Sequence, residues 1–200
     1  KGSVFVDPSA TAPYFLHFAV VRIRRKADQT ISAFAHEELV ECRLIGLRQK
    51  QADKVEECPV EYLEILRNGE GLPPSHVRFA ASVKDAIQQV RMYADITVAK
   101  GMADKRRADM LTALPERESF IRRGYDFQEA ELAERRIAVS EKARSGDSRA
   151  NQELTLIKER QRQLASLRDQ ALRVLAAEID LIEPHDVTFI AHALVVPSSI

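Results

Sequence analysis

The residues most suggestive of chemistry lie at His36-Glu37-Glu38, where a histidine precedes two acids. A zinc hydrolase site places a second histidine four positions after the first, so that both imidazoles bind one metal while the intervening glutamate serves as base. The residue at that position is Val40, so the second ligand is missing. We therefore interpret this segment as an exposed bulge between strand segments, without a metal.

Two further histidines, His17 and His192, lie in apolar segments that are typical of strands. If those strands are neighbours, the two imidazoles come close together, and His36 would be a candidate third metal ligand. No Asp, Glu or Cys accompanies them at a fixed spacing. We favour sheet histidines that are hydrogen-bonded locally or partly exposed over a metal site.

The remaining motifs do not complete a catalytic site. Gly69-Glu70-Gly71 is followed by Leu72-Pro73-Pro74, and no Gly-Lys-Ser or Gly-Lys-Thr occurs, so no phosphate loop is encoded. No serine, cysteine or threonine stands in a nucleophile elbow, and the carboxylates are spread along helical segments. We predict no catalytic, cofactor-binding or metal-binding residue in this chain.

Three basic clusters are candidates for contact with nucleic-acid phosphates. A free-standing nucleic-acid binder normally carries excess positive charge, whereas 30 Lys and Arg residues here balance 30 Asp and Glu residues. Acidic residues also interleave with each cluster, so an ordinary solvated surface stays the alternative. The candidate contacts are Arg24, Arg25, Lys105, Arg106, Arg107, Arg122 and Arg123.

Composition indicates a chain with its own core in a reducing compartment. Its 200 residues are 45% hydrophobic, which is enough to bury a core without covalent support. The only cysteines are Cys42 and Cys58, with neither disulfide nor zinc-ligand spacing. No apolar run approaches the roughly 18 residues of a membrane span, so we expect a cytoplasmic location. Because the chain begins at Lys1, we expect it to be part of a longer protein.

Aromatic and β-branched residues predict strands at both ends of the chain. Segments 14–24 and 186–196 are apolar on both alternating faces and should share a sheet. Segment 30–47 alternates in two runs whose phase changes near Glu37, which predicts a bent second strand. Segment 49–57 is polar, and Pro59 should open a short helix over 60–67.

Helical periodicity dominates the middle of the chain. It predicts a helix over 83–111, a break at Pro115, a second helix over 116–143 and a third that ends near Glu178. The tip lies at Arg144-Ser145-Gly146-Asp147, where Gly146 ends one helix and Asp147 or Ser148 caps the next. Apolar positions expected on the second helix are Phe120, Ile121, Phe127, Ala130, Ile137 and Val139; those on the third are Ala150, Leu154, Ile157, Leu164, Ala171 and Leu175.

These elements predict an α+β fold. A small antiparallel sheet body, formed by residues 1–82 and 179–200, would carry long helices over 83–178, in which 116–178 form a helical hairpin, or coiled-coil arm. Polar Gln161 and Arg168 interrupt the apolar seam of the arm. At ~1.5 Å rise per residue each arm helix would be ~45 Å long.

The second half of the chain resembles a known class of motor proteins. The resemblance rests on four segments and is specific only in that half, although it extends over 14–199. It is to the C-terminal, post-motor region of bacterial helicase-like ATPases of the switch/sucrose-nonfermenting class, which include the RNA-polymerase-associated translocase and phage-defence helicases. The segments are Glu131-Leu132-Ala133-Glu134-Arg135-Arg136, Glu141-Lys142-Ala143-Arg144-Ser145-Gly146-Asp147, Ile157-Lys158-Glu159-Arg160-Gln161-Arg162 and 187–197.

The resemblance implies an accessory role beside a motor. The parent protein would bind ATP and Mg²⁺ and translocate on double-stranded DNA. The family's phosphate loop, Asp-Glu box and arginine finger have no counterpart here, so no catalytic residue carries over. The expected partners are double-stranded DNA and the motor lobes of the same chain. The alternative is a protein-protein interaction module that uses the arm and is unrelated to nucleic acid.

Overall fold

A computed structural model describes residues 3–51, 54–64, 71–72 and 83–198 of the chain. The chain divides into two compact units. The sheet unit comprises Lys1–Ala27, His36–Arg106 and Ile182–Ile200, and the hairpin unit comprises Asp28–Ala35 and Arg107–Leu181. This division places the helical residues up to Arg106 with the sheet rather than with the arm.

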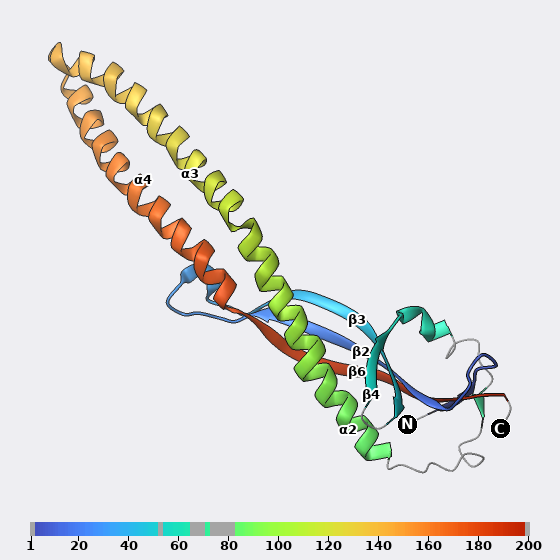
Figure 1. Ribbon diagram of the computed structural model, residues 1–200. Helices are drawn as coiled ribbons and strands as arrows, with labels where there is room; N and C mark the ends of the chain where they lie inside the picture. Colours follow the sequence, from blue (N-terminus) through green and yellow to red (C-terminus); the bar gives the residue numbers. More distant parts are fainter. Residues whose placement is uncertain (1–2, 52–53, 65–70, 73–82, 199–200) are drawn as a thin grey trace. The chain divides into compact units, whose positions relative to one another are not determined.

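The sheet unit is built around two long strands from opposite ends of the chain (Figure 1). Strand β2 covers Tyr14–Arg25 and pairs antiparallel with β6, Ile182–Val196. Both segments are rich in aromatic and β-branched residues, which suit a pleated surface buried on both sides. The prediction that the two terminal strands share a sheet is confirmed.

Four further strands complete a mixed sheet in the order β4-β3-β2-β6-β1-β5. Strand β3, Glu38–Gln51, pairs with β2, and β4, Lys54–Cys58, pairs with β3. On the other side β1, Ser3–Val6, runs parallel to β6, and β5, Gly71–Leu72, pairs with β1. The predicted α+β fold is confirmed, although the β1–β6 pair makes the sheet mixed rather than antiparallel.

The second predicted strand is wrong in its first half. Residues Ser32–Phe34 form a short 3-10 helix, and the strand begins only at Glu38. Alternation over Ile31, Ala33 and Ala35 was therefore a short-range pattern that a turn also satisfies. In the polar segment 49–57, residues up to Gln51 form the end of β3, and the edge strand β4 begins at Lys54.

Pro59 opens a 3-10 helix, Val60–Tyr62, as the N-terminal half of the predicted short helix requires. The rest of that helix, after Glu64, lies outside the described residues. So do Gly69 and Glu70 of the glycine motif and residues 73–82. Gly71 of the same motif belongs to β5.

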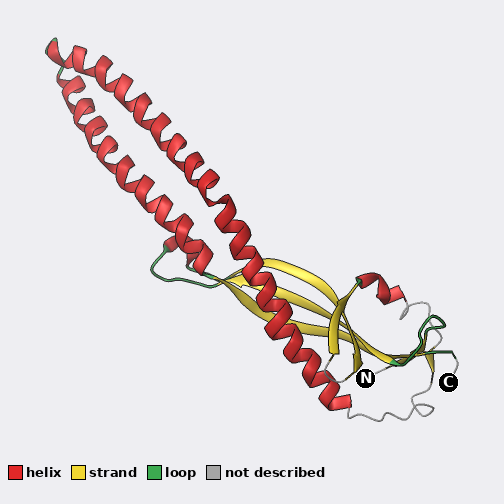
Figure 2. Ribbon diagram, viewed as in Figure 1, coloured by secondary structure: helices red, strands yellow, loops and turns green. Residues whose placement is uncertain are grey.

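One face of the sheet is contacted by helix α2, Val83–Tyr93, and by the π-helical segment Ala94–Ala99 that continues it (Figure 2). The α2 helix contacts β3 and β4, and the π segment contacts β2 and β6. The small residues of the π-helical segment, among them Ala94 and Ala99, are buried, and they let its backbone approach the strands closely. Val90 and Val98, which share a face at helical spacing, are also buried.

Helix α3 runs without a break over Lys100–Arg144, so the predicted break at Pro115 is wrong. A proline in a helix interior removes one backbone hydrogen bond and costs about 3 kcal/mol relative to alanine. In a helix of 45 residues that local cost is outweighed by the many remaining backbone bonds. The helix that was expected to start at Pro115 is therefore a continuation of the preceding one.

The tip of the hairpin forms as predicted. Gly146 has φ of 91°, a left-handed conformation that lacks a steric cost only in glycine. The carboxylate of Asp147 accepts hydrogen bonds from the backbone N–H groups of Arg149 and Ala150, and α4, Ser148–Asp180, starts there. These two residues reverse the chain and satisfy the first donors of α4.

The interior of the hairpin is narrow. Its distal part holds a cluster of Val139, Ala150 and Ile157, with Leu132, Ala143 and Leu154 packed around it. On α4 the predicted seam residues Leu164 and Leu175 are buried too. On α3, however, Phe120 and Phe127 are each 73% exposed and Ile137 is 64% exposed. A two-helix unit can bury only one stripe of each helix, so apolar residues outside that stripe stay in solvent.

Candidate functional site

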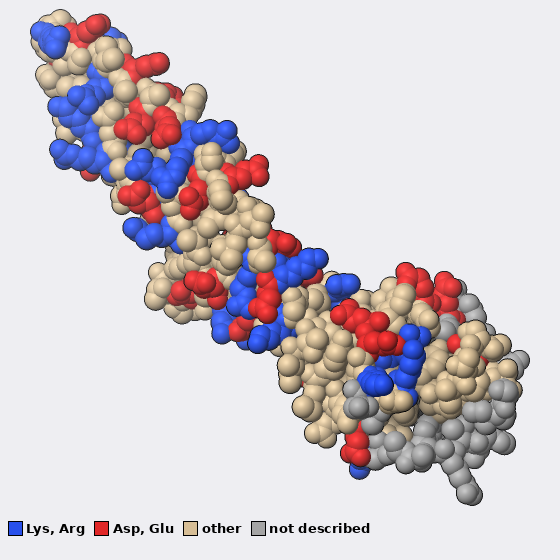
Figure 3. All heavy atoms as spheres, viewed as in Figure 1, with Lys and Arg blue, Asp and Glu red and all other residues tan. Residues whose placement is uncertain are grey.

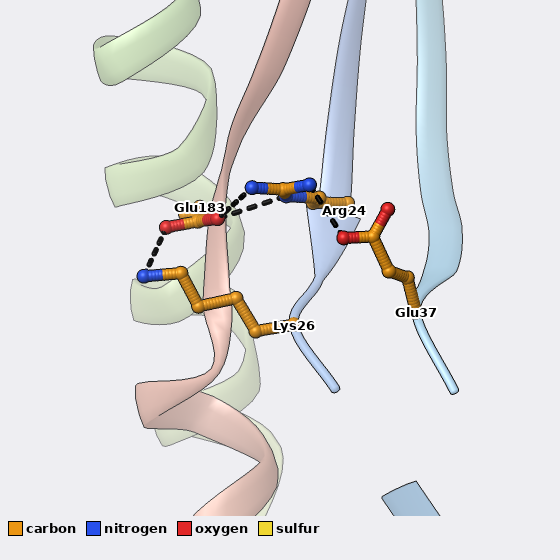
Figure 4. A network of polar contacts seen from close by, with 4 residues as sticks. All are labelled: Arg24, Lys26, Glu37 and Glu183. Carbon is orange, nitrogen blue, oxygen red and sulfur yellow. Dashed lines mark hydrogen bonds and ion pairs between the residues drawn. The ribbon is translucent and has the colours of Figure 1, made fainter. Parts of the chain in front are cut away.

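The basic end of β2 is joined to acids in an ion-pair network (Figure 4). The guanidinium of Arg24 lies 2.5 Å from a carboxylate oxygen of Glu37 and 2.6 Å from one of Glu183, and Lys26 Nζ lies 2.5 Å from the other oxygen of Glu183. Burial acts to raise the pKa of Glu183, but Lys26 and Arg24 outweigh it and hold that pKa below its ordinary value. The predicted contact residue Arg24 therefore already has two carboxylate partners.

Arg25 points into the protein rather than into solvent. Its side chain is only 8% exposed, and its Nη2 atom lies 2.8 Å from Glu38. The neighbouring Arg22 is paired with Asp186 at 2.9 Å. Arg22 and Arg25 stabilise the sheet, because each ion pair joins β2 to the neighbouring strand and neutralises charge there.

The other predicted contacts lie on α3. Lys105 and Arg106 are exposed within the sheet unit, and Arg107 is half-buried at the start of the hairpin unit. Arg122 and Arg123 are exposed, and a glutamate oxygen one turn earlier lies 3.9 Å from Arg122. The four exposed side chains are able to reach phosphate. All five residues stay predicted contacts.

The two strand histidines come together, as the neighbouring-strand hypothesis predicts. His17 on β2 is the register partner of His192 on β6, and their Nδ1 atoms are 2.7 Å apart. His17 is 1% exposed, and the ring of Phe189 stacks on His192. At that separation one Nδ1 must carry a proton and the other must be bare, so the two imidazoles are in different tautomers.

The surroundings of this histidine pair favour the neutral forms. Burial, and then the neighbouring His192, lower the pKa of His17 to about 4, while the carboxamide of Gln49 acts weakly the other way. Burial, followed by the positive charge of Arg91, lowers the pKa of His192 as well. The Nε2 atom of His17 is buried without a hydrogen-bond partner among the described residues. The pair is thus sensitive to acid.

A shallow hollow in the hairpin unit is lined by basic residues of both helices. Arg136 comes from α3, and Lys158, Gln161 and Arg162 come from α4. The Arg136 Nη1 group donates to Gln161 Oε1 over 3.4 Å, a weak hydrogen bond across the hairpin. The Arg136 hollow, as we call this site, presents three cationic side chains and one carboxamide to solvent.

Sequence reasoning did not find the Arg136 hollow. Arg136 is 22 residues before Lys158, so no local pattern in the sequence joins the two. The usable signal was Gln161, whose polar side chain interrupts an apolar seam and therefore faces the partner helix. Figure 3 shows Lys and Arg side chains over the hairpin helices, with Asp and Glu among them.

No family model, curated protein or solved structure matches this chain. Within the part of the chain that the structure describes, no three His, Cys, Asp or Glu side chains converge as metal ligands would. None of the described helices combines the length and the apolar character needed to cross a membrane.

Proposed function

We propose that this chain is an accessory C-terminal domain of an ATP-dependent DNA helicase or translocase, in which the hairpin positions DNA, the motor lobes or a partner. ATP and Mg²⁺ would bind in the motor of the parent protein, and the location would be cytoplasmic. The hairpin carries this proposal. Its helix α4 alone has 33 residues, or ~50 Å at ~1.5 Å per residue, and its surface is rich in charge.

The charge on the hairpin is suited to contact with a polyanion. Several arginines are held by carboxylates across or along the hairpin, as in Arg135 with Glu153 at 2.5 Å and Arg117 with Glu178 at 3.1 Å. Those pairs join α3 to α4 and leave other cations for a ligand. Phosphate contacts of this kind give affinity without reading base sequence, as expected for a domain that positions DNA beside a motor.

The 200-residue chain should bind a fluorescently labelled DNA duplex at low salt, measured by fluorescence anisotropy. The logarithm of the association constant should fall linearly with the logarithm of the salt concentration, because each neutralised phosphate releases counterions. Adding ATP should leave the affinity unchanged, because the proposal places ATP in the motor. Absence of binding at about 50 mM salt would contradict the DNA-contact form of the proposal.

A protein-protein interaction module is the second candidate, and two exposed aromatic residues favour it. Phe120 and Phe127 are each 73% exposed and are seven residues apart on α3, so they lie on the same face of the helix. Large apolar side chains that share an exposed face are typical of protein contact sites. Such a face would bind an apolar partner or a second copy of the chain.

If this second candidate holds through self-association, the mass measured by light scattering should rise with protein concentration. The double variant Phe120→Ser/Phe127→Ser should then stay monomeric, because the shared apolar face is lost. The matched control is Leu156→Ser/Leu167→Ser, which removes two exposed apolar residues of α4 and should leave association intact. A constant monomer mass for the unchanged chain excludes self-association.

A further inference from the structure

We propose that the Arg136 hollow binds a phosphate group of a nucleic-acid backbone. The inference rests on the proposed function and deepens it, because it names the place on the hairpin where the backbone is held. It also differs from the contacts predicted from sequence, since none of the four residues that line the hollow belongs to those clusters.

The cations of the Arg136 hollow repel one another. Lys158 and Arg162 are four residues apart on α4, and so lie on the same side of the helix. Like charges at that spacing destabilise a helix, and Arg136 adds a third positive charge from α3. A phosphate diester between them would reverse this repulsion, because its negative charge is shared by three cations.

The cations of the hollow have no acidic partners among the described residues. Arg135, next to Arg136 in the chain, is ion-paired with Glu153 at 2.5 Å. Among the residues that the structure describes, no carboxylate lies within ion-pair distance of Arg136, Lys158 or Arg162. Binding an anion therefore breaks no existing pair at this site, whereas at Arg24 it would have to displace Glu37 and Glu183.

The hydrogen-bond donors of the hollow match the oxygens of a phosphate group. Guanidinium groups present N–H donors in a planar fork that matches two phosphate oxygens, and the lysine ammonium adds a mobile point charge. Gln161 accepts from Arg136 through Oε1, which leaves its NH₂ group as a neutral donor toward the hollow. None of the four lining residues carries an aromatic ring on which a base would stack. The set fits a backbone phosphate rather than a nucleobase.

The hollow depends on the folded hairpin. Arg136 and Lys158 are brought together only because Gly146 and Asp147 reverse the chain between them, and because Val139 and Ile157 pack in the adjoining interior. Additional phosphates of the same backbone would be held by other cations along the hairpin.

The test compares two triple variants of the 200-residue chain in binding to a labelled DNA duplex. The hollow variant is Arg136→Gln/Lys158→Gln/Arg162→Gln. The control variant, Lys142→Gln/Arg144→Gln/Arg173→Gln, removes the same charge from exposed positions on the same two helices that belong neither to the hollow nor to the contacts predicted from sequence. Circular dichroism and thermal melts should show that both variants keep their helices.

The hollow variant should lose about 0.9 from the slope of log affinity against log salt, because the hollow holds one phosphate. One phosphate accounts for about 3.5-fold of the affinity change between about 50 and 200 mM salt, so the affinity of the variant should change by about that much less over this range. The control variant should keep a slope close to that of the unchanged chain.

Two outcomes would overturn the inference in different ways. If the unchanged chain binds and the hollow variant binds as well as the control variant, the hollow is not the contact site, although the proposed function stands. If the unchanged chain does not bind the duplex at low salt, the proposed function fails, and the assignment of the hollow fails with it.

Discussion

Lowering the pH from 7 to 5 should reduce the free energy of unfolding of the sheet unit by about 2 kcal/mol through His17 alone. The pKa of His17 is lowered to about 4 in the folded protein, whereas an unfolded histidine titrates near 6.5. Between pH 4 and pH 6.5 the unfolded state binds a proton at His17, whereas the folded state does not. Stability is then lost at about 1.4 kcal/mol per pH unit as the pH falls.

Because folding lowers the pKa of His17, the folded protein loses stability as the pH falls. A histidine whose pKa is lowered by folding contributes its full stability above pH 6.5, and the contribution is lost as the pH falls toward 4. Over the whole window the loss would be on the order of 3 kcal/mol. His192 acts in the same direction, because its pKa is lowered too.

The hydrogen bond between the two rings gives a structural reason for this sensitivity. One Nδ1 donates to the other over 2.7 Å, and a second proton would place two N–H groups face to face. Arg91, whose guanidinium carbon is 6.0 Å from the ring centroid of Phe189, adds further positive charge nearby. Protonation of the pair should therefore loosen the sheet face on which α2 packs.

Urea unfolding at a series of pH values from 7 to 5 measures this effect, because the carboxylates titrate mainly below that range. The variant His17→Gln should flatten the pH dependence, whereas His185→Gln, at an exposed position, should leave it unchanged. An NMR titration of the unchanged chain is independent of any variant. A midpoint for His17 close to 6.5 would contradict the prediction.

Replacing Gly46 with alanine should destabilise the sheet unit by about 1 to 3 kcal/mol, the usual cost of overpacking a tightly packed position. A Cβ at this position would lie 2.8 Å from the carbonyl oxygen of Cys58, 2.9 Å from its Sγ atom and 3.2 Å from Cε1 of Phe18. Gly46 is the register partner of both residues, on β4 and on β2. The extra methyl must therefore displace an edge strand or a core aromatic ring.

The matched control is Gly101→Ala in α3, which also lies in the sheet unit. A Cβ there would meet nothing within 4 Å. Alanine is favoured over glycine inside a helix by about 0.5 to 1 kcal/mol, so the control should gain stability while Gly46→Ala loses it. Urea unfolding at pH 7 compares the two substitutions in the same unit.

Thiol labelling gives a second measure of the Gly46 substitution. Burial raises the pKa of Cys58 to about 11, so its thiol should react slowly in the unchanged protein. If Gly46→Ala displaces β4, Cys58 should react faster, which is measured in a Cys42→Ser background because Cys42 is exposed. Unchanged stability together with unchanged labelling would show that the close approach at Gly46 is not needed.

The sequence alone predicted those elements whose structure is determined by the residues of a single segment. The apolar segments of β2 and β6 predicted buried strands, because few other structures accept so many β-branched and aromatic residues. Gly146 and Asp147 predicted the hairpin tip, since a left-handed residue followed by a side-chain cap is a local requirement.

Local signals misled where long-range packing was decisive. Pro115 predicted a helix end, but the surrounding helix of 45 residues continues through it. Short strand β1 was missed, because a parallel pair with β6 joins residues that are nearly the whole chain apart. Phe120 and Phe127 read as helix-packing residues, although only the pairing of α3 with α4 decides which stripe is buried.

For the candidate sites too, some features were predictable from the sequence and others appeared only in the tertiary structure. The sequence by itself determined the fold class, the two histidine-bearing strands and the turn that brings α3 back as α4, because these depend on residue type and short spacing. Only the tertiary structure decided that Arg24 is neutralised by Glu37 and Glu183, and that Arg136 lies beside Lys158 and Arg162. Electrostatic partners are chosen by distance in space, which residues far apart in the chain acquire only on folding.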